Sequence, residues 1–167
     1  MSGRSVCVAV LIFSGLVFAG CETYKPAYIA PEFVPSSLKK VAVVNNPLSK
    51  EKRHVDVDIA NVLLHRGIEA VLVPADTPPP PDIDGYFTYT DRWAWDMTMY
   101  LAKLDIQLHD SHTGAVLASA SYQQGPVHRY PSPTDIADAL VGQMLGEPPR
   151  KSHDRSDTPD GGASTKP

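Results

Sequence analysis

The sequence predicts an α+β domain of two layers, in which two helices pack on a mixed sheet of four or five strands. Short apolar runs and alternating segments typical of strands recur through residues 38–146. Two segments carry apolar residues at helical spacing, one near each end of that region. The region holds about 110 residues, which is enough for one two-layer core.

The first half predicts a strand, a helix and a second strand. Residues 41–44 form an apolar run that Asn-Asn-Pro closes at 45–47, which is typical of a buried strand. In residues 53–66 apolar residues recur at i, i+4, i+7 and i+8, and Gly67 can end the resulting helix. The apolar residues 70–73 predict the second strand.

The second half predicts antiparallel strands. Four prolines at 78–81 favour a stiff connector. Residues 86–90 are rich in strand formers, and residues 104–108 alternate apolar with polar. Asp-Ser-His-Thr-Gly at 110–114 favours a turn into the alternating residues 116–122, with Gly114 supplying a positive φ.

A closing helix is predicted after Ser132, which can cap it, with Pro133 at the first helical position and Asp135 in the first turn. Its expected buried face holds Ile136, Leu140 and Met144. The predicted order is β-α-β-β-β-(β)-α. The strand in parentheses is optional, because the number of strands depends on whether residues 92–98 break the third strand.

The charge balance argues against a nucleic-acid partner. The chain has 15 Lys and Arg against 19 Asp and Glu, a formal net charge of −4 and a sequence pI near 5.8. It therefore lacks the basic excess that neutralises phosphates.

The N-terminus has the layout of a secretory signal: Arg4, an apolar stretch over residues 6–18, then small residues. Phe18-Ala19-Gly20-Cys21 resembles the bacterial lipobox, which implies cleavage before a Cys21 that carries diacylglycerol. The alternative is an uncleaved signal anchor, but an apolar core of about 13 residues is short of the ~20 that a span needs.

Cysteine content agrees with a lipid anchor. Cys7 leaves with the signal, so Cys21 is the only cysteine of the mature chain and no intrachain disulfide can form. Glu22 stands where Asp retains lipoproteins of enteric bacteria at the inner membrane. The resemblance therefore implies an outer-membrane lipoprotein that faces the periplasm, with the periplasmic face of the inner membrane as the alternative.

Four regions are expected. Residues 1–20 form a signal peptide that is removed, and residues 21–37 form the lipidated cysteine with a Pro-rich tether. Residues 38–146 form the globular α+β domain. Residues 147–167 form a disordered tail, because no Leu, Ile, Val or Phe follows Leu145.

The hairpin Asp-Ser-His-Thr-Gly-Ala-Val-Leu-Ala at residues 110–118 precedes a final amphipathic helix. This layout resembles small lipid-anchored periplasmic proteins of Gram-negative bacteria. Some of these are auxiliary lipoproteins of ABC-type transporters and other envelope machinery. The resemblance implies a partner protein in the envelope.

A candidate binding surface lies where aromatic and charged residues alternate at the period of a strand. It consists of Tyr89, Arg92, Trp93, Trp95 and Asp96. Trp, Tyr and Arg are enriched at binding hot spots, and the same rings could hold the sugars of a cell-wall or outer-membrane glycan. The competing interpretation places both tryptophans together in the core, beneath a helix.

Other chemistry is weakly indicated. His109 and His112 flank Asp110 across a turn, a spacing that rarely makes a metal site, and Asp91 with Asp96 could be drawn as the carboxylate pair of a small hydrolase. The basic residues around 50–54 could touch an anionic headgroup or be a solvated helix end.

We expect no cofactor, no metal and no catalysis. The leading hypothesis is an accessory or scaffolding lipoprotein, followed by a glycan binder and a hydrolase.

Overall fold

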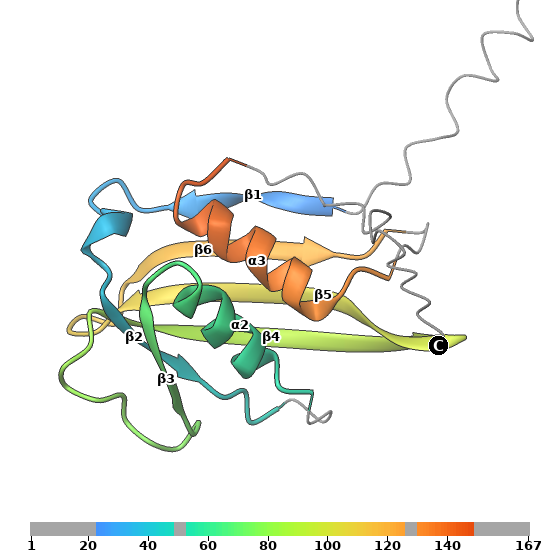
Figure 1. Ribbon diagram of the computed structural model, residues 1–167, viewed down its shortest axis with the longest axis horizontal. Coiled ribbons are helices and arrows are strands. Elements are labelled where there is room, and N and C mark those ends of the chain that lie inside the picture. The colour runs from blue at the N-terminus through green and yellow to red at the C-terminus, as the bar shows by residue number, and fades with distance from the viewer. Residues whose placement is uncertain (1–22, 49–52, 126–129, 149–167) are drawn as a thin grey trace, which may run out of the picture.

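The computed structural model describes residues 23–48, 53–125 and 130–148, and it shows two helices on one face of a six-stranded mixed sheet (Figure 1). The α+β class and its helix count are confirmed, whereas the expected four or five strands are wrong. The elements in chain order are β1 (Thr23–Ile29), a 3-10 turn η1 (Pro35–Ser37), β2 (Lys40–Val44), α2 (Val55–Leu64), β3 (Glu69–Val73), β4 (Gly85–Asp96), β5 (Thr98–Asp110), β6 (Val116–Gln123) and α3 (Pro133–Met144).

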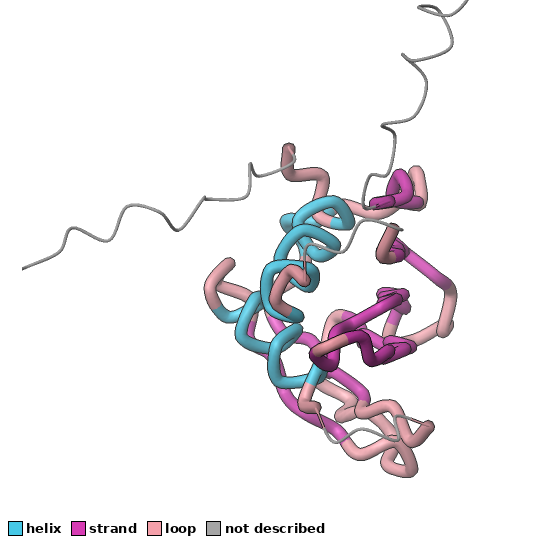
Figure 2. Tube along the Cα trace, turned by 90° about the vertical axis from the view of Figure 1, so that its right-hand side faces the viewer, coloured by secondary structure: helices cyan, strands magenta, loops and turns pink. Residues whose placement is uncertain are grey.

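The sheet order is β1-β6-β5-β4-β2-β3. β2 runs parallel to both β3 and β4, and the remaining neighbours are antiparallel. α2 packs on β2 and β3, while α3 packs on β1, β5 and β6, and the two helices contact each other. The opposite face of the sheet carries no helix of the described chain (Figure 2).

The start of α3 and the end of α2 lie beside residues that favour them. The Ser132 side chain accepts a hydrogen bond from the Asp135 amide at 3.1 Å, so the predicted cap of α3 is confirmed. α2 is shorter than the predicted 53–66, and Gly67 follows it with φ +76°, a conformation that glycine adopts without strain. The predicted buried residues of α3 are all fully buried.

The core lies between the helices and the strand face beneath them. Its largest fully buried side chains are Tyr122, Phe87, Ile59, Leu63, Leu101, Leu104, Ile106, Leu108, Ile136, Leu140, Met144 and Val41. A bulge in β5 shifts the register, so that Arg92 pairs with Lys103 and Trp93 pairs with Leu101. The extra residue turns Leu101 onto the same face as Leu104 and keeps that face apolar.

The predicted tether over residues 21–37 is wrong from Thr23 onward, because residues 23–29 form β1, an edge strand paired with β6. The ring of Tyr24 lies 5.0 Å from that of Tyr122, and Ala30 and Phe33 are buried in the core. In the sequence, Pro26 argues against a strand over residues 23–29, because proline cannot donate a backbone hydrogen bond. Proline is tolerated there because it lies within a register irregularity of an edge strand.

The predicted end of the domain at residue 146 is also early. Glu147 accepts a hydrogen bond from Arg66 Nε at 2.9 Å, and Arg66 Nη1 lies 2.7 Å from Asp138. The Arg66 side chain is only 6% exposed, and this ion-pair cluster joins the end of α2 to the middle of α3 and to the segment that follows α3. Burial works against the Arg66 charge, but the two carboxylates raise the pKa of its guanidinium above the ordinary value.

The predicted signal peptide, Cys21, residues 50–52 of the basic cluster and the predicted tail from residue 149 onward lie outside the described residues. Within the parts that the structure describes, no helix has the length and apolar character needed to cross a membrane.

Candidate functional site

The segment that carries both tryptophans lies in a long hairpin made of β4 and β5. Residues 92–96 are part of β4, so the third strand is unbroken. Lys103 pairs with Arg92 on one side and with Gln123 at the end of β6 on the other. The hairpin residues from Trp93 to Leu101 therefore project past the end of β6 (Figure 1).

Tyr89 and Trp93 lie on the helix side of β4 and are held in place. Tyr89 is 8% exposed, and burial raises the pKa of its hydroxyl to about 12. Trp93 is half-buried, and its Nε1 donates to Asp91 Oδ2 at 2.7 Å. Asp91 Oδ1 accepts from Asn46 Nδ2 at 3.0 Å, and the Arg53 guanidinium lies 4.9 Å from the Trp93 ring centroid. These contacts fix the base of the hairpin against the domain.

Trp95 lies two residues further along the same strand face, yet 72% of it is exposed. The alternation at the period of a strand places both tryptophans on one face, but the two differ in burial. Neither a shared position in the core nor a shared exposed surface is therefore correct for both of them. The helix layer ends before it reaches the far part of the hairpin (Figure 1). Arg92 and Asp96 alternate onto the other face and are exposed, so the five predicted residues do not form one surface.

The apex of the hairpin is apolar and strained. Met97 is 89% exposed and has φ +58°, a conformation that costs a residue with a side chain about 1 kcal/mol or more. The rings of Tyr100 and Tyr130 meet edge to face at 5.4 Å, and the Tyr130 hydroxyl lies 3.4 Å from the Asp96 carbonyl oxygen. We call Trp95, Met97, Tyr100 and Tyr130 the tip cluster.

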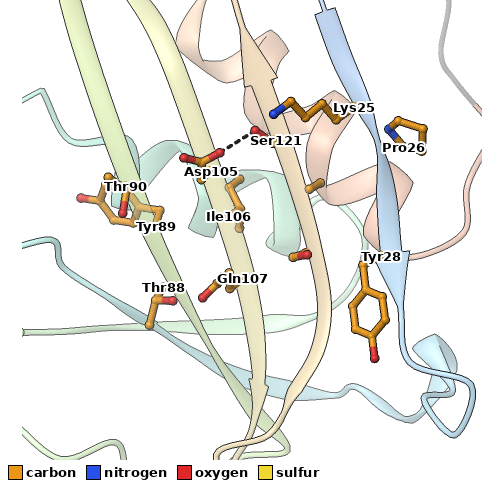
Figure 3. Close-up of a pocket in the computed structure, with 12 residues that line it drawn as sticks. Lys25, Pro26, Tyr28, Thr88, Tyr89, Thr90, Asp105, Ile106, Gln107 and Ser121 are labelled. Carbon is orange, nitrogen blue, oxygen red and sulfur yellow. Dashed lines mark hydrogen bonds between the residues drawn. The ribbon is translucent and has the colours of Figure 1, made fainter.

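The second feature is the helix-free face of the sheet, which we call the open face. Its central residues are polar and come in pairs two positions apart: Thr88, Thr90, Asp105, Gln107, Ser119 and Ser121. They line a shallow hollow of about 390 Å³, which Lys25 and Tyr28 of β1 border on one side (Figure 3). Ser121 Oγ donates to Asp105 Oδ1 at 2.5 Å, and Lys103 Nζ lies 2.6 Å from Asp105 Oδ2.

The open face is not among the sites predicted from the sequence, although the sequence carries a signal for it. Thr88 and Thr90, Asp105 and Gln107, and Ser119 and Ser121 occupy alternate positions of three consecutive strands. The alternation that predicts an apolar, buried face of the sheet also predicts a polar face on the other side. The contribution of β1 does not follow from this alternation, because the prolines of residues 21–37 favour a tether over a strand.

A second hollow of about 700 Å³ lies beside the proline run, lined by Pro79, Pro80 and Pro81 and by Tyr86 and His112. The Tyr86 ring stacks on that of His109, with 4.9 Å between centroids. This hollow and the first share Thr88, so they are neighbours on the open face.

The histidines around the turn contribute to its structure. His109 lies 3.0 Å from Thr88 Oγ1 through Nε2 and 3.2 Å from the Gly114 carbonyl through Nδ1. Asp110 Oδ1 accepts from the His112 and Thr113 amides, and these bonds lower the pKa of Asp110. Across the described ranges, no group of three or more His, Cys, Asp or Glu side chains could hold a metal ion.

The carboxylates drawn as a hydrolase pair have different surroundings. Asp91 braces Trp93 and Asn46 near the base of the hairpin, whereas Asp96 lies beside its apex.

The architecture is that of a small two-layer domain in which the helices of the described residues cover one face of the sheet. No family model and no curated protein matches the sequence. The solved structures that share the fold include two of PelC from Paraburkholderia phytofirmans in dodecameric form. A point variant is 18% identical with a TM-score of 0.51, and the other form is 17% identical with a TM-score of 0.50. Each match covers 75% of this chain and 95% of the PelC chain, and at this identity it shows the fold alone.

Proposed function

We propose that this protein is a non-catalytic accessory lipoprotein of the bacterial envelope. A lipid on Cys21 anchors it in the outer membrane facing the periplasm, and the open face docks on another envelope protein. The observation that carries the proposal is the open face itself. A sheet with helices on one side leaves its other side for a partner, and here that side is a hollowed surface of hydroxyl, amide and charged groups bordered by Tyr28.

Two further observations support docking over catalysis. The histidines and acids that could serve a reaction are engaged in turn, brace and surface contacts, as described above. The fold is also that of a protein whose solved form is a dodecamer, so one domain of this architecture presents surfaces to other chains. Assembly of the present protein with copies of itself is one form that docking could take.

A photo-crosslinking residue at Gln107 of the full-length protein in living cells tests the docking face. Gln107 is exposed in the middle of the open face, and Asn61 is exposed on the outer side of α2, which makes it the matched control. We expect a discrete adduct from position 107 and none from position 61. Mass identification then separates another envelope protein from a second copy. Equal labelling at both positions, or none at either, would contradict the docking face.

A second candidate function is binding of an envelope glycan in the same hollow. The lining of threonine and serine hydroxyls, the Gln107 amide and the Asp105 carboxylate could hydrogen-bond sugar hydroxyls, with Tyr28 at the border. A heterogeneous carbohydrate adduct at position 107, in place of a protein adduct, would favour this function.

Replacing Cys21 with Ser tests the anchor. The thioether lipid forms only on sulfur, and cleavage follows lipidation, so Cys21→Ser should leave an unacylated precursor. Radiolabelled palmitate should enter the wild-type protein and be lost completely from the variant, whereas Cys7→Ser should keep the label. A wild-type protein without label, or one that retains residues 1–20, would refute the lipoprotein assignment.

A further inference from the structure

We propose that the tip cluster inserts into the interfacial layer of the membrane that carries the lipid anchor. The inference rests on the proposed lipidation of Cys21 and adds a second contact with the bilayer, made by the β4–β5 hairpin. The tip cluster contacts the phospholipid surface, and the side chains that insert are mainly those of Trp95 and Met97.

Only a short length of chain separates the proposed anchor from the fold. β1 begins at Thr23, only two residues after Cys21. Two residues span at most about 7 Å when fully extended. A tether of 16 residues would have left the domain free to turn, whereas two residues hold the start of β1 close to the bilayer surface.

The start of β1 also determines which end of the sheet lies near the bilayer. Thr23 pairs with Gln123, Gln123 pairs with Lys103, and Lys103 pairs with Arg92. All four residues therefore lie at one level across four neighbouring strands. β4 continues from that level toward its apex, so the start of β1 and the hairpin tip lie at the same end of the molecule (Figure 1).

The hairpin tip extends further from the level of Thr23 than the connection to Cys21 can. Met97 is five residues beyond Arg92, which corresponds to about 16 Å along a strand. The tip therefore extends past the ~7 Å within which Cys21 must lie from Thr23. With the anchor embedded, the hairpin meets the headgroups unless the domain tilts away, and tilting is limited by the short connection.

The chemistry of the tip suits that location. Trp and Tyr concentrate at membrane–water interfaces, where an apolar ring lies among headgroups while its polar atom stays hydrated. Trp95, Met97 and Tyr130 are 72%, 89% and 39% exposed, so the tip presents apolar surface that the described part of the domain leaves uncovered. Met97 has a positive φ, a conformation that glycine or asparagine adopts more easily than methionine. Turn geometry therefore does not explain the large side chain at this position, whereas a contact made by that side chain does.

Tryptophan fluorescence tests the insertion directly, because Trp93 and Trp95 are the only two tryptophans of the chain. Full-length protein is purified from membranes and reconstituted into phosphatidylethanolamine and phosphatidylglycerol vesicles, with or without phosphatidylcholine brominated on its acyl chains. Trp93→Phe reports Trp95, and Trp95→Phe reports Trp93 as the matched control. We expect bromine to quench Trp95 by about twofold or more and to leave Trp93 within about 10% of its unbrominated intensity.

The variants and outcomes separate the alternatives. Circular dichroism shows whether Trp93→Phe folds. If it does not, the fluorescence of the Trp95→Phe variant is subtracted from that of the wild-type protein, and the difference gives the quenching of Trp95. An unquenched Trp95 overturns the inference, and a blue-shifted but unquenched Trp95 shows that a protein chain covers the tip. Palmitate labelling of the same preparation decides the lipoprotein assignment separately, so an unlabelled protein and an unquenched tryptophan are distinct failures.

Discussion

Deleting residues 22–37 from the full-length protein is expected to abolish cooperative unfolding of the domain. The deletion removes β1 from the edge of the sheet, exposes the β6 edge and takes Ala30 and Phe33 out of the core. Burial of one large apolar side chain contributes about 1.5–3 kcal/mol, so the combined loss of Tyr24, Phe33 and their neighbours approaches the 5–15 kcal/mol that stabilises a whole domain. A circular dichroism melt of the variant should show a broad, shallow transition.

The matched control for this deletion is removal of residues 149–167, which follow the last described residue. We expect that truncation to leave the melting temperature within about 2 °C of the full-length value, as for loss of a segment without core contacts. Glu147 must be kept, because it pairs with the buried Arg66. A deletion of residues 22–37 that still melts sharply near the wild-type temperature would show that these residues form a spacer after all.

The elements that the sequence predicted well have local causes. Ser132 and Pro133 determine the start of α3, Gly114 enables the β5–β6 turn, and the alternation in residues 104–108 determines which face of β5 is buried. Each depends on residues within a few positions of one another, so a single sequence carries the signal.

The features that were missed depend on contacts between distant segments. β1 exists because β6 offers an edge to residues that include a proline, and Pro26 is acceptable only at an irregular point of that pairing. The bulge that keeps Leu101 on the core face depends on the register between β4 and β5. The different burial of Trp93 and Trp95 depends on how far the helix layer extends along the hairpin, which periodicity within β4 cannot show.

The contrast between the two tryptophans leads to the second large effect. Trp93→Ala removes a half-buried ring, a hydrogen bond to Asp91 and the surface on which Arg53 lies. We expect a loss of about 3 kcal/mol, at the lower end of the range for truncating a buried aromatic residue, because Trp93 is not fully buried. For a domain of this size such a loss lowers the melting temperature by about 10–20 °C.

Trp95→Ala is the matched partner, because it truncates the same side chain two residues along the same strand. With 72% of the residue exposed, its free energy of unfolding should change by no more than about 0.5 kcal/mol in detergent solution. The two variants therefore separate a structural tryptophan from a contact tryptophan: the first changes the melting temperature, and the second changes only binding of the tip to vesicles. Equal losses of stability would mean that Trp95 is covered by another part of the protein, and the hairpin apex would then no longer be available to a membrane.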